Sequence, residues 1–483
     1  MKFTTYFILL YLSVNIMTAQ TTEKIFYSDF FPEKEARTVK IWLPPTASYT
    51  PVSNVLYVFD ADTYFDYTAG TVNYLCKLGY IPPMAVVGVF YRDKTDRTDV
   101  GFNDDMTLDK YGDAFLNYLT KEVMPYINDS VLKTQHSYNL YFGHSYLAKY
   151  ACYYIKNYPD IFDAYLMFAP ADSTATPQFD KQLLNAKRFF ISVGTDDAKS
   201  RLSFADNLYE ALHDVANPNF SQLKIVENVG HMDIVPHTLF AALQFIYRDY
   251  IFRYNIEDYI NEDIGSMDNY RALNNLNLTN YKCELPLKAG VVSDLFSDTL
   301  KYTIEDLDYI TDRVKNYPDA NLQEIIGFNY LELDTKKAEE QFKLALELCR
   351  QTGTLHYSYN IYRGWLDVYD EQPNSYEKQL AILEMAMIDQ PREIFWYRRR
   401  GNVHIDNNNL KEGIADLKIF VDNLYAVRES DKVWLCQAYY RMARAYYTLG
   451  EVKESEYWVD MSLGINPNYQ DAINLKETLK RGS

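Results

Sequence analysis

Residues 140–149 decide the fold, and they read Leu140-Tyr141-Phe142-Gly143-His144-Ser145-Tyr146-Leu147-Ala148-Lys149. An apolar run typical of a β-strand meets the triplet Gly-His-Ser and passes directly into residues typical of a helix. A strand, a sharp turn that carries a serine and then a helix together form a nucleophile elbow. The pattern therefore predicts that Ser145 is a catalytic nucleophile. The alternative is a Gly-x-Ser turn without chemical meaning, and the rest of the chain has to distinguish the two.

The segments on both sides of this turn alternate between strands and helices. Apolar runs typical of buried parallel strands occupy residues 54–59, 84–90, 138–142, 164–170, 188–194 and 223–226. Apolar residues recur at helical spacing in residues 111–128, 149–158 and 239–252. We therefore expect an α/β domain with a mostly parallel sheet over residues 20–254.

Beyond residue 254 the pattern changes to helices. Residues 255–316 are acidic and rich in asparagine, which favours a linker followed by irregular helices. Near the end of the chain, the residue types follow the order of a tetratricopeptide repeat, which is small, aromatic, glycine, small, bulky, small and proline. The residues at these positions are Ala443, Tyr446, Gly450, Ser455, Val459, Ser462 and Pro467. About four degenerate repeats of this kind fit residues 317–483. We expect an all-α repeat domain whose concave groove binds a peptide or protein partner, with an unrelated helical domain as the alternative.

The first 19 residues have the layout of a secretory signal peptide. Lys2 precedes an apolar run over residues 6–17, and Thr18-Ala19-Gln20 follows as a cleavage site after Ala19. We expect an exported protein, periplasmic or secreted, and the alternative is an uncleaved anchor. No long apolar segment follows, so no membrane span is expected after removal of the signal.

Charge and cysteine usage exclude several classes of protein. A net charge of −18 argues against nucleic-acid binding, which needs a basic face. The 5 cysteines are far apart and show no Cys-x-x-Cys spacing. Neither a disulfide framework nor a zinc site is predicted, and buried thiols are the expectation.

A serine nucleophile needs a base that is itself oriented by a carboxylate, in the chain order serine, acid, histidine. Asp196 and Asp197 follow the strand at 188–194, and His231 follows the strand at 223–226. His231 is the expected base, since the other histidines beyond the elbow in this domain, His213 and His237, lie in or next to predicted helices. Asp197 is the expected acid, and Asp196 is the alternative.

Acyl transfer also needs hydrogen-bond donors for the oxyanion of the tetrahedral intermediate. The expected donors are the backbone N–H groups of Tyr146, next to the nucleophile, and of Asp62, after the strand at 54–59. This chemistry requires no metal and no organic cofactor.

Several segments together resemble the esterase D-like esterases of the α/β-hydrolase fold, which include enterobactin and feruloyl esterases. They are Val39-Lys40-Ile41-Trp42-Leu43-Pro44, residues 55–62, Val86-Val87-Gly88-Val89 with Arg97-Thr98-Asp99, residues 122–127, Gly143-His144-Ser145 and residues 158–165. The last segment contains the Pro-Asp-x-Phe-Asp run that the family places after the elbow helix. The resemblance implies ester hydrolysis with Ser145 as nucleophile, His231 as base and the acid at Asp196 or Asp197.

Two segments depart from the family pattern. After the serine, the family pattern is Gly-x-Ser-x-Gly-Gly, whereas this chain has Leu147 and Ala148 in place of the two final glycines. In the oxyanion loop the family usually has Leu-Asp-Gly, whereas this chain has Phe59-Asp60-Ala61. A catalytically weakened or inactive scaffold whose repeats bind a partner is therefore the alternative function. Among enzymes, the alternative is a serine peptidase. Siderophore lactones, feruloyl or acetyl groups on glycans, and thioesters all fit the resemblance as substrates.

Overall fold

The computed structural model describes residues 20–32, 34, 36–48, 50–91, 97–103, 107–171, 178–180, 184–215, 218–250, 266–296, 302–370, 372–424 and 429–482. The predicted signal peptide at residues 1–19 lies outside the described residues. The chain divides into two compact units, Met1–Val291 and Val292–Ser483. Within the described ranges, no helix combines the length and the apolar character needed to cross a membrane.

The first unit is built on an 8-stranded sheet in the order β1-β2-β4-β3-β5-β6-β7-β8. Strands β1 and β2 pair antiparallel, as do β2 and β4, and every other neighbouring pair is parallel. The strands are β1 (Gln20–Tyr27), β2 (Ala36–Leu43), β3 (Asn54–Val58), β4 (Met84–Val89), β5 (Tyr138–His144), β6 (Ala164–Phe168), β7 (Arg188–Gly194) and β8 (Ser221–Val226). The predicted mostly parallel α/β architecture is confirmed.

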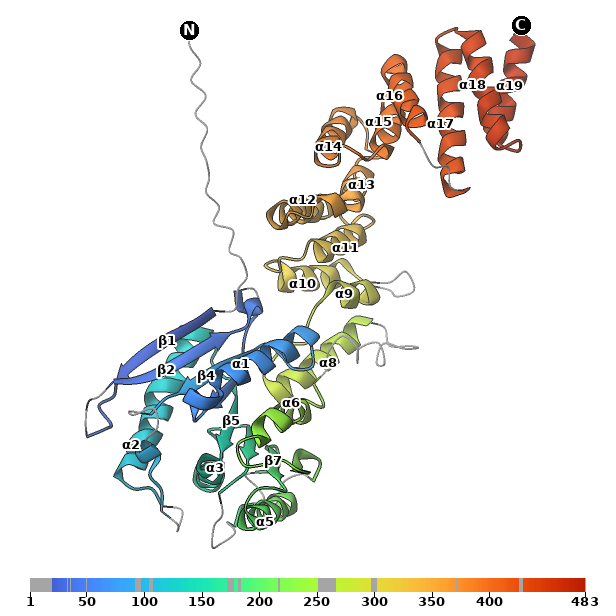
Figure 1. Ribbon diagram of the computed structural model, residues 1–483. Coiled ribbons are helices and arrows are strands. Elements are labelled where there is room, and N and C mark those ends of the chain that lie inside the picture. The colour runs from blue at the N-terminus through green and yellow to red at the C-terminus, as the bar shows by residue number, and fades with distance from the viewer. Residues whose placement is uncertain are drawn as a thin grey trace, which may run out of the picture. The chain divides into compact units, whose positions relative to one another are not determined.

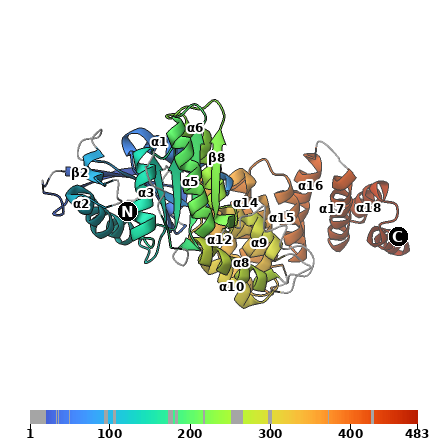
Figure 2. The same ribbon diagram turned by 90° about the horizontal axis from the view of Figure 1, so that it is seen from below.

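Helices cover both faces of this sheet, with α1 and α6 on one face and α2, α3 and α5 on the other (Figures 1 and 2). They are α1 (Ala61–Leu78), α2 (Lys110–Tyr118), α3 (Tyr146–Asn157), α5 (Lys199–Val215) and α6 (Ile234–Ile246). The predicted helix at 111–128 continues past α2 as π-helical turns over Leu119–Val123 and Tyr126–Leu132. Helix α6 begins before the predicted residue 239, because Pro236 falls in its first turn, where the missing N–H lacks an intrahelical partner anyway.

Successive strand residues point to opposite faces, so each buried strand contributes to two cores. In β3, for example, Leu56 packs towards α1 and α6, whereas Tyr57 packs towards α3. The α3 face is rich in fully buried tyrosines, among them Tyr57, Tyr141, Tyr154 and Tyr165. Burial raises the pKa of each of these phenols well above its usual value.

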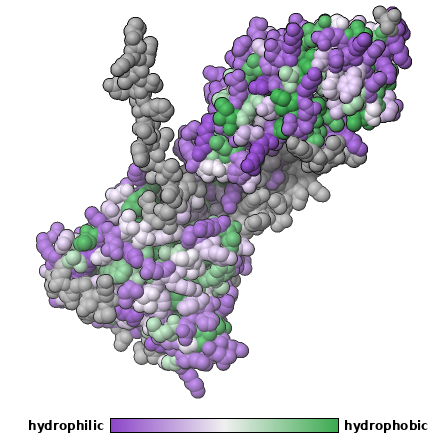
Figure 3. Space-filling model, turned by 45° about the horizontal axis from the view of Figure 1, so that its top comes forward, coloured by the Kyte–Doolittle hydropathy of each residue, from purple (hydrophilic) through white to green (hydrophobic). Residues whose placement is uncertain are grey.

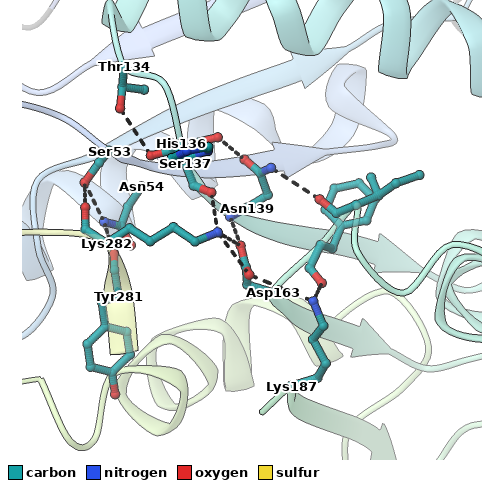
Figure 4. Close-up of polar contacts among 12 residues, drawn as sticks. Ser53, Asn54, Thr134, His136, Ser137, Asn139, Asp163, Lys187, Tyr281 and Lys282 are labelled. Atoms are coloured by element: carbon teal, nitrogen blue, oxygen red, sulfur yellow. Dashed lines mark hydrogen bonds and ion pairs between the residues drawn. The ribbon is translucent and has the colours of Figure 1, made fainter. Parts of the chain in front are cut away.

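Helix α8 (Ser266–Tyr281) belongs to the first unit, and its carboxyl end is anchored at the amino ends of β3 and β5 (Figure 4). The fully buried Asn54 side chain donates from Nδ2 to the Tyr281 carbonyl oxygen at 3.0 Å. Its Oδ1 accepts a hydrogen bond from the Tyr247 hydroxyl at 2.7 Å. Asn54 thereby joins the sheet, α6 and α8.

Lys282 strengthens the same anchor with charge. Its ammonium group donates to the Ser137 carbonyl oxygen at 2.8 Å and to Asp163 Oδ2 at 3.0 Å (Figure 4). Residues after the predicted boundary at 254 therefore pack with the α/β unit instead of forming only a linker. The boundary itself stays a prediction, since residues 251–265 lie outside the described residues.

The second unit is all-helical, as predicted. Its described helices, with α9 straddling the junction, are α9 (Ala289–Leu295), α10 (Ile304–Val314), α11 (Ala320–Tyr330), α12 (Thr335–Thr352), α13 (Tyr359–Asp367), α14 (Tyr376–Asp389), α15 (Phe395–Asp406), α16 (Leu410–Asp422), α17 (Glu429–Thr448), α18 (Val452–Ile465) and α19 (Gln470–Gly482). Helices α11 and α12, α15 and α16, and α17 and α18 pack as pairs. On the face shown in Figure 3, hydrophobic and hydrophilic residues of this unit are interspersed.

Small residues allow these paired helices to approach closely. A Cβ atom on Gly401 of α15 would lie 3.0 Å from the Gly413 carbonyl oxygen of α16. The helical character is confirmed, and the tetratricopeptide identity stays a prediction.

Replacing Asn54 with Ala should destabilise the α/β unit by about 2–4 kcal/mol, because a buried hydroxyl and a buried carbonyl each lose a partner. Urea denaturation of the purified variant measures the change. Thr134→Ala is the matched control, since the Thr134 hydroxyl makes only an exposed hydrogen bond, to the His136 carbonyl oxygen (Figure 4). Equal stabilities of the two variants would contradict the role given to Asn54.

Candidate active site

Ser145 follows β5 directly and precedes the first residue of α3. Its backbone has φ 59° and ψ −117°, which is a strained conformation for a residue other than glycine. The conformation is held by hydrogen bonds from Ser145 N–H to the Phe168 carbonyl oxygen and from Ala171 N–H to the Ser145 carbonyl oxygen, at 2.9 and 3.0 Å. The sequence thus forms a sharp strand-turn-helix with a serine at its apex.

The glycine before this turn explains how the chain tolerates Leu147. A Cβ atom at Gly143 would lie 2.6 Å from the Leu147 carbonyl oxygen, so only glycine fits beneath the first turn of α3. The Tyr141 hydroxyl donates to the same carbonyl oxygen at 2.7 Å. The Leu147 and Ala148 side chains are fully buried in the core beside α3, so the bulk of Leu147 points away from the turn.

Asp197 and His231 meet at the carboxyl ends of β7 and β8. His231 Nδ1 and Asp197 Oδ2 are 2.7 Å apart, and the Asp197 side chain is only 5% exposed. Asp196, the alternative acid, is exposed, and its backbone N–H donates to the Val229 carbonyl oxygen. Of the two carboxylates, Asp197 is the one that contacts the imidazole.

The loop that carries His231 is fitted closely against the end of β7. A Cβ atom at Gly194 would lie 1.9 Å from the Val229 carbonyl oxygen. The Asn228 N–H donates to the Thr195 hydroxyl at 2.9 Å, and the Thr195 N–H donates to the Val226 carbonyl oxygen at 3.0 Å. These contacts fix the distance between the loop bearing Asp197 and the loop bearing His231.

His144 positions the His231 loop from the other side. The buried His144 ring lies with its Nε2 2.9 Å from the His231 carbonyl oxygen, and the two imidazole rings are in contact with centroids 4.6 Å apart. Burial lowers the pKa of His144 to about 4, which keeps the ring neutral at pH 7. A neutral ring can donate Nε2–H to the carbonyl oxygen, so His144 anchors His231 to the strand that carries the serine.

Ser145 Oγ accepts a hydrogen bond from Arg201 Nη1 at 3.0 Å. Within the described part of the chain, no hydrogen bond joins Ser145 Oγ to the His231 imidazole. Arg201 Nε lies 3.5 Å from Asp197 Oδ1, so the guanidinium group spans the serine and the acid. The structure brings Ser145, Asp197 and His231 to one edge of the sheet but leaves the serine bonded to an arginine.

Helices α1 and α3 offer backbone donors at the sheet edge that carries Ser145. Helices α1 and α3 follow β3 and β5, which are parallel neighbours, so both helices begin at the same edge of the sheet. Tyr146 begins α3, and Asp62 lies in the first turn of α1 with an exposed side chain. Asp60, at the start of α1, forms a bidentate ion pair with Arg97, in which Arg97 Nε and Nη2 donate to Asp60 Oδ1 and Oδ2 at 3.0 and 2.8 Å. A helix amino end is favourable for developing negative charge.

Two residues of this site were not found from the sequence. His144 stands inside the Gly-His-Ser triplet, so its position was visible but its contact with the His231 carbonyl oxygen was not. Arg201 stands four residues after Asp197, a spacing that places both side chains on one side of a helical turn. This spacing was the available sequence signal for a contact between Arg201 and Asp197, but it could be interpreted only with the knowledge that α5 begins at Lys199. No group of three or more metal-ligating side chains is found in the described ranges.

Comparison with known proteins gives a family match over the first unit. Residues 33–238 match the family model described as Putative esterase. Among curated proteins, no sequence is significantly similar to this chain.

Solved structures similar to this chain include three from different organisms. An uncharacterised protein from Capnocytophaga ochracea has 14% identity and a TM-score of 0.46, covering 77% of this chain and 100% of its own. Siderophore hydrolase EstA from Aspergillus nidulans has 14% identity and a TM-score of 0.37, covering 48% and 95%. A CE1 ferulic acid esterase from Anaeromyces mucronatus has 17% identity and a TM-score of 0.35, covering 47% and 90%.

Replacing Gly194 with Ala should lower kcat/KM for ester hydrolysis by roughly 100-fold, because the new methyl group displaces the loop that holds His231. Gly70→Ala is the control, since a Cβ atom at Gly70 meets nothing within 4 Å and should only stabilise α1 slightly. Steady-state kinetics on a short acyl ester measures both. Wild-type activity in the Gly194 variant would show that the close approach is unimportant.

Acidification should destabilise the α/β unit through His144. The folded-state pKa of about 4 lies below the unfolded value of 6.5, so the unfolded chain binds the proton first as the pH falls. The contribution of neutral His144 to the free energy of unfolding is fully present above pH 6.5 and is lost as the pH falls from 6.5 to 4. At pH 5 the loss should be about 2 kcal/mol.

The matched variant is His144→Gln, which keeps an N–H donor and removes the titrating group. Unfolding in urea is measured at pH 7.5 and pH 5 by the loss of labelling of Ser145 with a fluorophosphonate probe. The decrease in the urea midpoint between pH 7.5 and pH 5 should be smaller in the variant than in wild type. Identical shifts would remove His144 as the cause.

Proposed function

We propose that the first unit, whose residues 33–238 match the family model described as Putative esterase, hydrolyses carboxylic esters by a Ser-His-Asp triad through an acyl-enzyme. The observation that carries the proposal is the 2.7 Å contact between Asp197 and His231 at the sheet edge where Ser145 sits in a strained turn. Each residue follows the carboxyl end of a parallel strand, in the order expected for this chemistry.

In the first half of the proposed reaction, Ser145 Oγ attacks the ester carbonyl carbon while His231 Nε2 takes the hydroxyl proton. The tetrahedral intermediate then collapses, and the carbon–oxygen bond to the alcohol breaks. His231 returns the proton to the departing alcohol oxygen, which leaves the acyl group on Ser145.

In the second half, water attacks the acyl carbon and His231 takes a proton from it. Collapse of this intermediate releases the carboxylic acid and returns the proton to Ser145 Oγ. Asp197 accepts from Nδ1–H of His231, so that Nε2 is the nitrogen that exchanges protons, and its charge favours the imidazolium.

Negative charge on the carbonyl oxygen would be bound by the backbone N–H groups of Tyr146 and Asp62. Both belong to first turns of neighbouring helices, whose amino ends carry partial positive charge. The exposed Asp62 carboxylate is directed to solvent, which reduces the conflict between it and an oxyanion.

The helical unit and the export signal extend the proposal beyond the active site. We assign the second unit to tetratricopeptide-like repeats that bind a peptide or protein segment, supported by the paired helices and the close approach at Gly401 and Gly413. Residues 1–19 have the composition of a signal peptide, so an exported, periplasmic or secreted protein is proposed.

Replacing Ser145 with Ala should lower kcat for p-nitrophenyl acyl ester hydrolysis by roughly 10⁴-fold or more, and Asp197→Asn by a similar or smaller factor. Labelling by a fluorophosphonate probe should be lost in the Ser145 variant. Ser203→Ala, an exposed serine on α5, is the control and should keep both activity and labelling.

Equal hydrolysis by wild type and the Ser145 variant would overturn the triad. Absence of any ester hydrolysis, together with absence of a serine adduct, would favour an inactive scaffold. Cleavage of peptides in preference to esters would favour the peptidase alternative.

A further inference from the structure

Arg201 reaches from α5 into the centre of the proposed active site. Its Nη1 donates to Ser145 Oγ at 3.0 Å and to the Ala169 carbonyl oxygen at 3.3 Å. Its Nε lies 3.5 Å from Asp197 Oδ1. The side chain is 23% exposed, and Nη2 has no hydrogen-bond partner within the described ranges. Among the described residues, one edge of the guanidinium group is therefore left unpaired beside Ser145.

Two other arginines near this edge, both among the described residues, are already paired. Arg97 is paired through two hydrogen bonds with Asp60, and Arg37 is fully buried and paired with Asp99. Arg201 differs because its contact with Asp197 is an ion pair of 3.5 Å that makes no hydrogen bond. Asp197 instead makes its 2.7 Å contact with His231.

The bond from Arg201 opposes the proposed reaction in the resting site. It draws on an oxygen lone pair of Ser145 that would have to attack the ester carbonyl carbon. The serine also lacks the hydrogen bond to His231 that general-base catalysis requires. An acceptor that takes the guanidinium group away from Ser145 would leave the hydroxyl to His231.

Only a strong acceptor can favour that exchange. A neutral carbonyl oxygen on the substrate is no better for a guanidinium group than the Ser145 and Ala169 oxygens that it would replace. A carboxylate accepts two parallel hydrogen bonds from a guanidinium group, and such charge-assisted bonds are roughly twice as strong as neutral ones.

The place of the carboxylate on the substrate follows from the other groups. The oxyanion is directed to the first turns of α1 and α3, on the β3 side of the serine, and the departing oxygen has to face His231. The remaining substituent of the reacting carbon is the acyl chain. Arg201 binds next to Ala169, after β6, on the side away from β3.

We propose that Arg201 is a specificity-determining residue that binds a carboxylate on the acyl chain of the ester, and that this contact releases Ser145 to His231. This inference rests on the proposed ester hydrolysis by Ser145. The preferred substrates are then esters of dicarboxylic acids, in which one carboxyl group is esterified and the other is ionised.

Kinetics on matched esters test the proposal. The anionic substrates are the mono-p-nitrophenyl esters of glutaric and adipic acid, and the neutral partners are the same esters with the second carboxyl group methylated. Release of p-nitrophenol is followed after subtraction of the uncatalysed rate. Wild type should prefer the anionic ester of at least one chain length by roughly 10- to 100-fold in kcat/KM.

Arg201→Met should lose this preference, mainly through a higher KM for the anionic esters, and should hydrolyse the neutral esters faster than wild type, because Ser145 no longer accepts a hydrogen bond from Arg201. Arg201→Lys should keep part of the preference, since it keeps the charge but not the two-pronged geometry. Lys199→Met is the matched control, because it removes an exposed charge of the same sign from the same helix, and it should keep the full preference.

An unchanged ratio of anionic to neutral hydrolysis in Arg201→Met would overturn the proposal. So would a folded Arg201→Met variant that loses hydrolysis of all four esters, since Arg201 would then act on the chemistry and not on selection. Equal hydrolysis by wild type and Ser145→Ala would instead refute the serine mechanism itself, which separates the two failures.

Discussion

The close passage of the Leu147 carbonyl over Gly143 is the constraint on which the site depends. With no side chain at Gly143, α3 starts directly above β5 and leaves Ser145 in a turn that ordinary backbone geometry disfavours. Hydrogen bonds from Tyr141 and to Phe168 hold the turn in place. The strain is thus sustained by the core of the sheet, and the same core accepts the Leu147 side chain.

The groups that we propose to react come from three loops that are distant in the chain but adjacent in the sheet. Parallel pairing of β5, β6, β7 and β8 brings their carboxyl ends together, and close packing between loops sets the remaining distances. Val229 against Gly194 and His144 against the His231 carbonyl oxygen are the two contacts that fix the histidine loop. Neither contact involves a group that would react, yet both decide where the imidazole lies.

Much of this organisation could be predicted from the sequence because it is local. Buried parallel strands are continuous apolar runs, and the serine, the acids and His231 follow such runs within a few residues. The roles of Arg201 and His144 could not be predicted, since each depends on contacts between loops that the sequence does not place. The packing of α8 was missed for the same reason: Asn54 and Tyr281 are far apart in the chain, and the polar pattern around 266–281 resembles a linker.

The tyrosine-rich core beside α3 limits the pH up to which the α/β unit stays folded. Tyr57, Tyr141, Tyr154 and Tyr165 are fully buried, and their pKa values in the folded state lie well above those of the unfolded chain. Above pH 10 the unfolded chain gives up phenolic protons that the folded unit retains, so folding becomes less favourable with each further rise in pH. The ultraviolet absorbance of these phenols would therefore change in one cooperative step with unfolding. Alkaline denaturation of the unit can thus be followed by tyrosine absorbance without an added probe.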